Sequence, residues 1–125
     1  MENLMRTILA LAALAACPLS AQAATLTAAD GKSLAEQYCS ACHRVSREQD
    51  QPPAVAVDSS PGAETVQAPS FARIAAKPDR TAAQLRERIM NPHYPMREQQ
   101  FIPEELDAIV AYILSLRAAG AGEDW

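Results

Sequence analysis

The strongest hydrophobic pattern in the chain lies near its C-terminal end. Between residues 106 and 116, leucine, isoleucine and valine recur at the spacing of one helical face. Pro103 suits the first position of a helix, and the acidic residues that follow suit the positive end of the helix dipole. Arg117 and Gly120 mark the end of the pattern. These signals predict a long amphipathic helix that begins at Pro103.

A second helix is predicted from its start signal. Thr81 and Gln84 have the spacing of a capping box, in which a hydroxyl and an amide side chain each satisfy a backbone N–H group. Leu85 and Ile89 then fall on one helical face. The helix is expected to run to about Met90, after which an Asn-Pro pair ends it.

Two further helices are predicted upstream. Asp30 is a candidate N-cap, and the apolar positions after it predict a helix over residues 31–41. Residues 69–76 are expected to form a short helix that turns Phe71 and Ile74 toward the core. No stretch alternates between apolar and polar residues as a half-buried strand does. The fold class is therefore predicted to be all-α.

A long loop is predicted between residues 44 and 68. The segment contains Gln-Pro-Pro at 51–53 and Asp-Ser-Ser-Pro-Gly at 58–62, which favour turns and loops. Loops of this length without structure of their own are usually functional or mobile. The segment is therefore either a partner-docking loop or a solvated insertion, and it carries four acidic residues, Glu48, Asp50, Asp58 and Glu64.

The first 23 residues have the features of an export signal. Arg6 supplies a positive start, residues 8–16 are apolar but too few to cross a bilayer, and Ala-Gln-Ala at 21–23 fits a signal-peptidase site. Cleavage there leaves a single domain over residues 24–125. Residues 14–17, Leu-Ala-Ala-Cys, also resemble a lipoprotein box, in which Cys17 would carry a lipid membrane tether. Both routes predict export, and a bacterial periplasm is the expected location.

Composition narrows the class of protein. Eleven Lys and Arg residues stand against 15 Asp and Glu residues, which gives a net charge of −4. The basic patch that nucleic-acid binding requires is not visible, so no nucleic-acid partner is expected. Aromatic residues make up only 5% of the chain, and alanine, which buries little area, supplies much of the apolar content. A core this thin needs a disulfide, a metal or a cofactor to support it.

Residues 39–43 carry the most specific motif in the chain. Cys-Ser-Ala-Cys-His is C-x-x-C-H, the attachment pattern of c-type haem. The thiols of Cys39 and Cys42, about one helical turn apart, can each add to a vinyl group of one porphyrin, and His43 then lies over the iron. A zinc site would need further ligands, and a thioredoxin-like redox pair would need a surrounding βαβ pattern. The motif therefore predicts one covalently bound haem c.

The candidates for the second axial ligand of the iron are methionine and histidine side chains downstream of the motif. Met96 is the preferred candidate, because it lies in a proline-bounded loop that can fold back across a haem. His93 and Met90 are the alternatives, and Met90 is also explained as core filler at the end of a helix. His/Met ligation fills both axial positions and favours ferrous iron, which suits electron transfer. A vacant position would instead indicate gas binding or peroxide chemistry.

With these features the chain resembles a small bacterial class I cytochrome c over nearly all of its predicted domain. The resemblance implies the cytochrome c fold, with about four helices around one haem, and it implies thioethers at both cysteines of the motif and axial ligation by His43 and Met96. It rests on four stretches, residues 31–43, 68–71, 92–96 and 106–116.

The resemblance also implies roles for residues outside the motif. Pro69 resembles the proline whose carbonyl accepts a hydrogen bond from the proximal imidazole and so orients the ring. Gly31 resembles the glycine that lets the last helix cross closely, and Tyr112 resembles the aromatic residue that packs into that crossing. Six residues are expected to contact the haem or the core: Phe71, Ile74, Leu85, Ile89, Tyr94 and Phe101.

The function implied is electron transfer, with no enzymatic site of the chain's own. The first hypothesis is a carrier of one electron between redox proteins, such as a dehydrogenase and an oxidase or reductase. Lys32 and Lys77 are the only lysines, so the acidic chain is expected to meet a partner surface that is basic or mainly apolar. The alternatives are the haem subunit of a larger oxidoreductase complex, and a haem-based sensor or peroxidase if the distal ligand is labile.

Overall fold

The computed structural model describes residues 25–118 and Trp125, so the export signal predicted over residues 1–23 and the alternative at Cys17 lie outside the described residues. The all-α prediction holds for all of the regular structure except one small pair of strands. In chain order the elements are α2 (Ala28–Tyr38), β1 (Val55–Ala56), β2 (Thr65–Val66), α3 (Phe71–Ala75), α4 (Ala82–Met90) and α5 (Pro103–Ala118). None of the helices in the described part of the chain has the length and apolar character needed to span a membrane.

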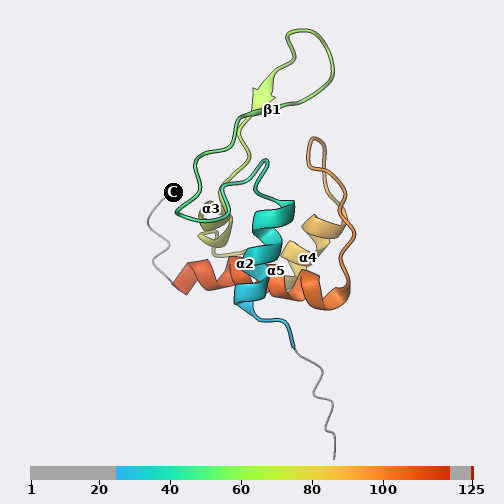
Figure 1. Ribbon diagram of the computed structural model, residues 1–125. Coiled ribbons are helices and arrows are strands. Elements are labelled where there is room, and N and C mark those ends of the chain that lie inside the picture. The colour runs from blue at the N-terminus through green and yellow to red at the C-terminus, as the bar shows by residue number, and fades with distance from the viewer. Residues whose placement is uncertain (1–24, 119–124) are drawn as a thin grey trace, which may run out of the picture.

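The C-terminal helix α5 is the element on which the other helices pack. α2 crosses it, and α3 and α4 lie against it (Figure 1). Ile109, Val110 and Ile113 of α5 are almost completely buried in this arrangement. Several of their buried neighbours are small, among them Ala35 and Ala75. The core is therefore as thin as the composition predicted.

The crossing of α2 over α5 depends on Gly31. This glycine is buried, and a Cβ atom placed on it would lie 1.9 Å from the backbone oxygen of Ala108. The obstacle is backbone within a helix, which cannot rotate away as a side chain can. The role that the resemblance implied for Gly31 is thus confirmed.

We expect Gly31→Ala to lower the free energy of unfolding by about 3 kcal/mol or more, because the added methyl group forces the two helices apart. Thermal unfolding followed by circular dichroism measures the effect. Ser33→Ala, on an exposed position of the same helix, is the control and should change little. A Gly31→Ala protein that melts within about 2 °C of the parent would contradict so close a crossing.

α2 begins earlier than predicted, at Ala28, because Thr27 rather than Asp30 is its N-cap. The Thr27 hydroxyl accepts a hydrogen bond from the Asp30 N–H, and the Asp30 carboxylate accepts one from the Thr27 N–H. Asp30 is therefore the third helical residue of a capping box. The helix also ends earlier, at Tyr38, because the backbone turns at Cys39 instead of continuing to residue 41.

The predicted starts of the two C-terminal helices are confirmed, and a helix is present near the third predicted position. Thr81 and Gln84 form the predicted capping box at the start of α4, which ends at Met90. α5 begins at Pro103. α3 is shorter than predicted, and it starts after its N-cap Ser70, whose side chain accepts a hydrogen bond from a backbone N–H.

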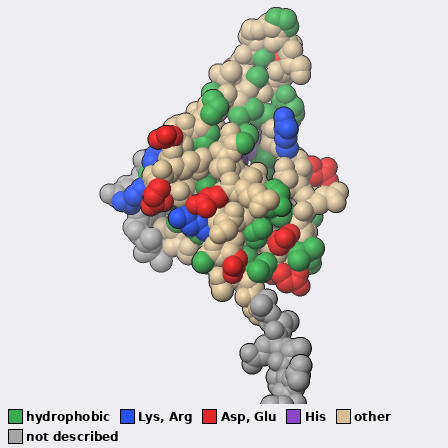
Figure 2. Space-filling model, in the orientation of Figure 1, with side chains coloured by type: hydrophobic (Ala, Val, Ile, Leu, Met, Phe, Trp, Pro, Cys, Tyr) green, Lys and Arg blue, Asp and Glu red, His purple; other side chains and the backbone are tan. Residues whose placement is uncertain are grey.

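The loop over residues 44–68 contains the strand pair, which the sequence analysis did not predict. Val55 lies opposite Val66 in an antiparallel register. In the turn between the strands, the Asp58 side chain accepts a backbone hydrogen bond and Gly62 adopts a positive φ of 79°. Strands of two residues are too short to produce a readable alternation. The hairpin projects away from the helices, and hydrophobic side chains lie along it and below it (Figures 1 and 2).

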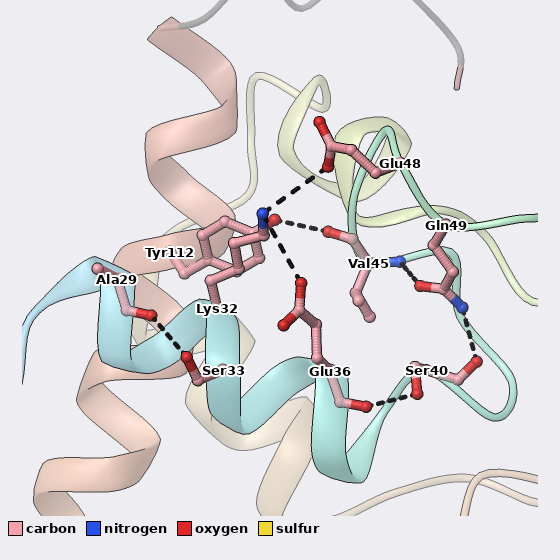
Figure 3. A network of polar contacts seen from close by, with 9 residues as sticks. All are labelled: Ala29, Lys32, Ser33, Glu36, Ser40, Val45, Glu48, Gln49 and Tyr112. Atoms are coloured by element: carbon pink, nitrogen blue, oxygen red, sulfur yellow. Dashed lines mark hydrogen bonds and ion pairs between the residues drawn. The ribbon is translucent and has the colours of Figure 1, made fainter.

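Tyr112 joins α5 to the segment that follows the C-x-x-C-H motif. Its ring is buried in the crossing region and lies 6.3 Å from that of Phe71, between centroids. Its hydroxyl donates a 2.7 Å hydrogen bond to the carbonyl oxygen of Val45 (Figure 3). Burial, reinforced by the negative charges of Glu36 and Glu48, raises the pKa of Tyr112 to about 12.

The raised pKa of Tyr112 predicts that the stability of the fold depends on pH in alkaline solution. The folded state raises the pKa of Tyr112 above its ordinary value of 10.0. The neutral Tyr112 hydroxyl therefore stabilises the fold fully below pH 10, and this stabilisation is lost as the pH rises toward about 12. The free energy of unfolding should fall there by at most about 1.4 kcal/mol per pH unit from this one group. Urea unfolding at a series of pH values measures the slope. Tyr112→Phe should remove this contribution, and a variant whose slope equals that of the parent would contradict it.

Candidate haem site

The C-x-x-C-H residues form a tight turn at the C-terminal end of α2. The Cys39 N–H donates the last helical hydrogen bond, 2.8 Å, to the carbonyl of Ala35. The N–H groups of Cys42 and His43 then both donate to the Cys39 carbonyl, at 3.2 and 2.9 Å. The turn brings the two thiol residues and the imidazole residue together, and both cysteines are half-buried and free of any disulfide.

The environment of Cys39 differs from that of a redox-active thiol. Burial, with a smaller contribution from Cys42, raises the pKa of the Cys39 thiol to about 11. Reactive C-x-x-C pairs have the opposite property, a lowered thiol pKa that yields thiolate at neutral pH. The buried thiol of Cys39 therefore lacks the lowered pKa that is typical of a thioredoxin-like redox pair.

The ring of His43 is oriented by a hydrogen bond from outside the motif. Its Nδ1 atom lies 2.8 Å from the carbonyl oxygen of Pro69. A carbonyl can only accept, so Nδ1 carries the proton and Nε2 keeps a free lone pair. The contact that the resemblance implied between His43 and Pro69 is present.

α3 holds Pro69 beside the motif. The Phe71 N–H, in the first residue of α3, donates a 3.0 Å hydrogen bond to the carbonyl of Arg44. The Phe71 ring lies 5.7 Å from the His43 ring, between centroids, in a tilted arrangement. Phe71 is buried, as expected of a pocket residue.

These residues fit a covalently attached haem. Two free thiols stand on one turn, and the adjacent His43 presents Nε2 as a ligand while Nδ1 is held by Pro69. A structural zinc site needs four ligands of the His, Cys, Asp or Glu type. Over residues 25–118 and Trp125, no group of three or more such side chains is placed so that it could hold a metal ion.

Met96 lies on the loop between α4 and α5. It is half-buried, and its N–H donates a 2.9 Å hydrogen bond to the carbonyl of His93. A cleft of about 420 Å³ is lined by Met96 and Met90, together with Asn91, Pro92 and Glu98. Met90 is 44% exposed, so its interpretation as core filler was wrong. The helix ends at Met90, and its side chain faces the cleft rather than the core.

The loop is tied to the motif end of α2 by an aromatic pair. Phe101 meets Tyr38 edge to face, with ring centroids 5.4 Å apart, and Tyr38 immediately precedes Cys39. Figure 1 shows this loop rising on the same side of the helices as the C-terminal end of α2. Tyr94, which was expected to contact the haem or the core, is 65% exposed and so is not part of the protein core.

His93, the alternative imidazole ligand, is held by an arginine. The Arg88 guanidinium lies 3.2 Å from His93 Nδ1. A guanidinium can only donate, so Nδ1 accepts and the proton of the neutral ring is on Nε2. His93 therefore has the tautomer opposite to that of His43.

Gln49 is a residue of the site that the sequence analysis missed. Its side-chain amide bonds to two backbone carbonyls of the C-x-x-C-H segment and to the N–H of Val45 just beyond it. A glutamine in a polar loop gives no sequence signal, because the same residue type is equally common on solvated surfaces. The bonds become visible only when residues 44–49 are seen to fold back on the motif.

One of the four acidic residues of the 44–68 loop is bound to α2. The Glu48 carboxylate lies 3.7 Å from the ammonium group of Lys32, which also pairs with Glu36 at 3.7 Å (Figure 3). Exposed pairs of this kind contribute little stability. Their consequence is that Glu48 lies close to α2 and is partly neutralised, while its side chain remains 75% exposed.

The sequence of this chain is similar to those of known proteins. A model of the cytochrome c family matches residues 28–117. The chain is similar to cytochrome c-552 of Bradyrhizobium diazoefficiens, with 34% identity over 104 residues, covering 83% of this chain and 88% of that protein. No solved structure matches the chain. The match over most of its length means that the chain belongs to the cytochrome c family.

Proposed function

We propose that this protein carries one electron at a time on a haem c that is attached through Cys39 and Cys42 and ligated by His43 and Met96. Cytochromes c bind haem covalently and transfer electrons. The observation that supports His43 as the iron ligand is the hydrogen bond between His43 Nδ1 and the Pro69 carbonyl. It leaves Nε2 as the only ring nitrogen able to ligate a metal.

Haem c, when bound, supplies an iron that alternates between the ferric and ferrous states. The residues of this chain set the conditions for that exchange. The Pro69 carbonyl fixes the orientation of the His43 ring and makes it a better electron donor. Buried Phe71 limits access of water to the proximal side. A thioether from Met96 favours the ferrous state and so raises the reduction potential.

The environment of the distal loop supports Met96 over the other two candidates. His93 carries its proton on Nε2 while Arg88 donates to Nδ1, so the ring has no free lone pair without a change of tautomer. Met90 lines the same cleft as Met96 but belongs to the last turn of α4, where helix geometry restrains it. Met96 lies in the loop, which leaves it more freedom to reach an iron.

We further propose that the protein works in a bacterial periplasm, after removal of residues 1–23 or as a lipoprotein anchored at Cys17. The support for this is the signal in the sequence. The partners would be redox proteins, such as a dehydrogenase and an oxidase or reductase. With a net charge of −4, the chain suits a basic or mainly apolar partner surface and brief docking.

A second candidate function is the haem subunit of a larger oxidoreductase. The observation that favours it is a set of large apolar side chains exposed at and beside the α4–α5 loop, Met90, Tyr94 and Ile102, of which Ile102 is 58% exposed. A stable subunit interface would cover such side chains. Copurification with a catalytic subunit distinguishes this function from that of a free carrier.

Intact mass and absorbance spectroscopy on protein made in a host that attaches haem test the proposal together. We expect the mass of a chain processed at one of the two predicted sites plus one haem, a low-spin ferric spectrum, and the charge-transfer band of a sulfur ligand on iron. A colourless polypeptide after denaturation would overturn the haem assignment. A coloured protein without the sulfur band that binds carbon monoxide rapidly when reduced would favour a sensor or peroxidase.

A further inference from the structure

The side chain of Gln49 bonds to three backbone groups on and beside the C-x-x-C-H motif. Its Nε2 group donates to the carbonyl of Ser40 at 2.8 Å and to the carbonyl of His43 at 3.2 Å. Its Oε1 atom accepts from the Val45 N–H at 2.9 Å. Figure 3 shows the amide lying between Val45 and Ser40.

These bonds use nearly all of the hydrogen-bonding capacity of the Gln49 amide. A glutamine side chain has two N–H donors, and both are engaged, each on a different carbonyl. One of these carbonyls lies between the two cysteines, and the other belongs to the histidine. Gln49 therefore joins the thiol part of the motif to the imidazole part, which no other side chain in the described interactions does.

Gln49 is itself fixed in place. Its backbone carbonyl accepts a 2.7 Å hydrogen bond from the Arg44 guanidinium, and its N–H donates to the carbonyl of Ser46 at 3.4 Å. The residue is half-buried. Val45, which donates to the amide, is held from its other side by the Tyr112 hydroxyl. The amide thus belongs to a segment that is held to α5 and to itself by several hydrogen bonds.

We infer that Gln49 is a positioning residue for the proximal ligand, holding the backbone of His43 in the place where Pro69 can orient its ring. Pro69 alone fixes the direction of one ring nitrogen. The position of the ring also depends on the backbone that carries it, and the Gln49 amide restrains that backbone on both sides of Cys42. This inference rests on the proposed function, since it requires His43 to be the iron ligand.

Gln49→Glu tests the donor half of this arrangement with almost no change in shape. A carboxylate still accepts from the Val45 N–H, but it places an oxygen opposite the two carbonyls instead of two N–H groups. Gln49→Ala is the second variant, because it removes the amide without adding charge. Gln67→Glu and Gln67→Ala are matched controls, since Gln67 donates one 3.1 Å hydrogen bond to the Pro52 carbonyl and does not contact the motif.

The measurements are made on haem-loaded protein and include signals that general stability does not affect. We expect the proton NMR shifts of the haem methyl groups in the ferric protein, which report the orientation of the axial imidazole, to change in both Gln49 variants and not in the Gln67 variants. Hydrogen exchange of the Val45 amide should accelerate about tenfold in Gln49→Ala, which removes its acceptor, and less in Gln49→Glu. The reduction potential should shift in the same two Gln49 variants.

Different results would contradict the role of Gln49 and the proposed ligand set. Haem methyl shifts and a potential equal to those of the parent in both Gln49 variants, even with a lowered melting temperature, would reduce Gln49 to a structural role and overturn the inference alone. A parent protein whose ferric spectrum lacks an axial imidazole would overturn the proposed ligand set, and this inference with it.

Discussion

Replacing Cys39 and Cys42 together with serine is expected to leave a colourless chain that is largely unfolded. The reason lies in the core. Among the residues that the structure describes, the largest fully buried side chains are Ile109, Val45 and Val110, and several of their neighbours are alanines. So small a core leaves little net stability once the conformational entropy cost of ordering the chain is counted. Covalently attached haem would supply the missing apolar surface around which the helices pack.

Far-ultraviolet circular dichroism and urea unfolding check this expectation on protein from the same haem-attaching host. Ala41→Ser is the matched control, because it adds a hydroxyl at an exposed position between the two cysteines without touching either thiol. The control should keep its colour and its cooperative transition. A double serine variant with the helix content and sharp transition of the parent would contradict the view that haem completes the core.

Met96→Ala is expected to change the iron more than any other single substitution on the distal side. Loss of the thioether removes the ligand that favours ferrous iron, so the reduction potential should fall by on the order of 0.1 V, within the roughly 0.8 V that axial ligands span. The ferric sulfur band should disappear, and the reduced protein should bind carbon monoxide.

Met90→Ala is the control for this experiment, since Met90 lines the same cleft and has the same chemistry. It should keep the sulfur band and a potential close to that of the parent. The ligand assignment fails if Met96→Ala keeps both properties while Met90→Ala or His93→Ala loses them. Potentiometric titration followed by absorbance distinguishes these results.

The helices were predictable because their signals are local. The capping box of Thr81 and Gln84 and the proline at position 103 each act within one turn, and both helices begin where predicted. The start of α2 was misplaced because Thr27 and Asp30 are both good caps three positions apart. In a capping box the two bond to each other, and the first of them is the N-cap.

The parts of the site that were not predictable depend on contacts between distant segments. Gln49 acts on the motif only because residues 44–49 fold back over it. Whether Tyr94 is covered depends on packing around its loop, which spacing along the chain does not determine. The contact between His43 and Pro69 was expected from the family resemblance rather than from any local pattern.

The meeting of α2 and α5 at Gly31 has a consequence for how the protein is made. This pairing joins the beginning and the end of the described chain, so it cannot form until the C-terminal helix has been synthesised and released. Until then the thiols at the end of α2 lack the helix that closes the fold, so we expect them to remain more accessible for haem attachment. Because α2 and α5 pair late, we expect a period during biosynthesis when haem can be attached before the polypeptide folds around it.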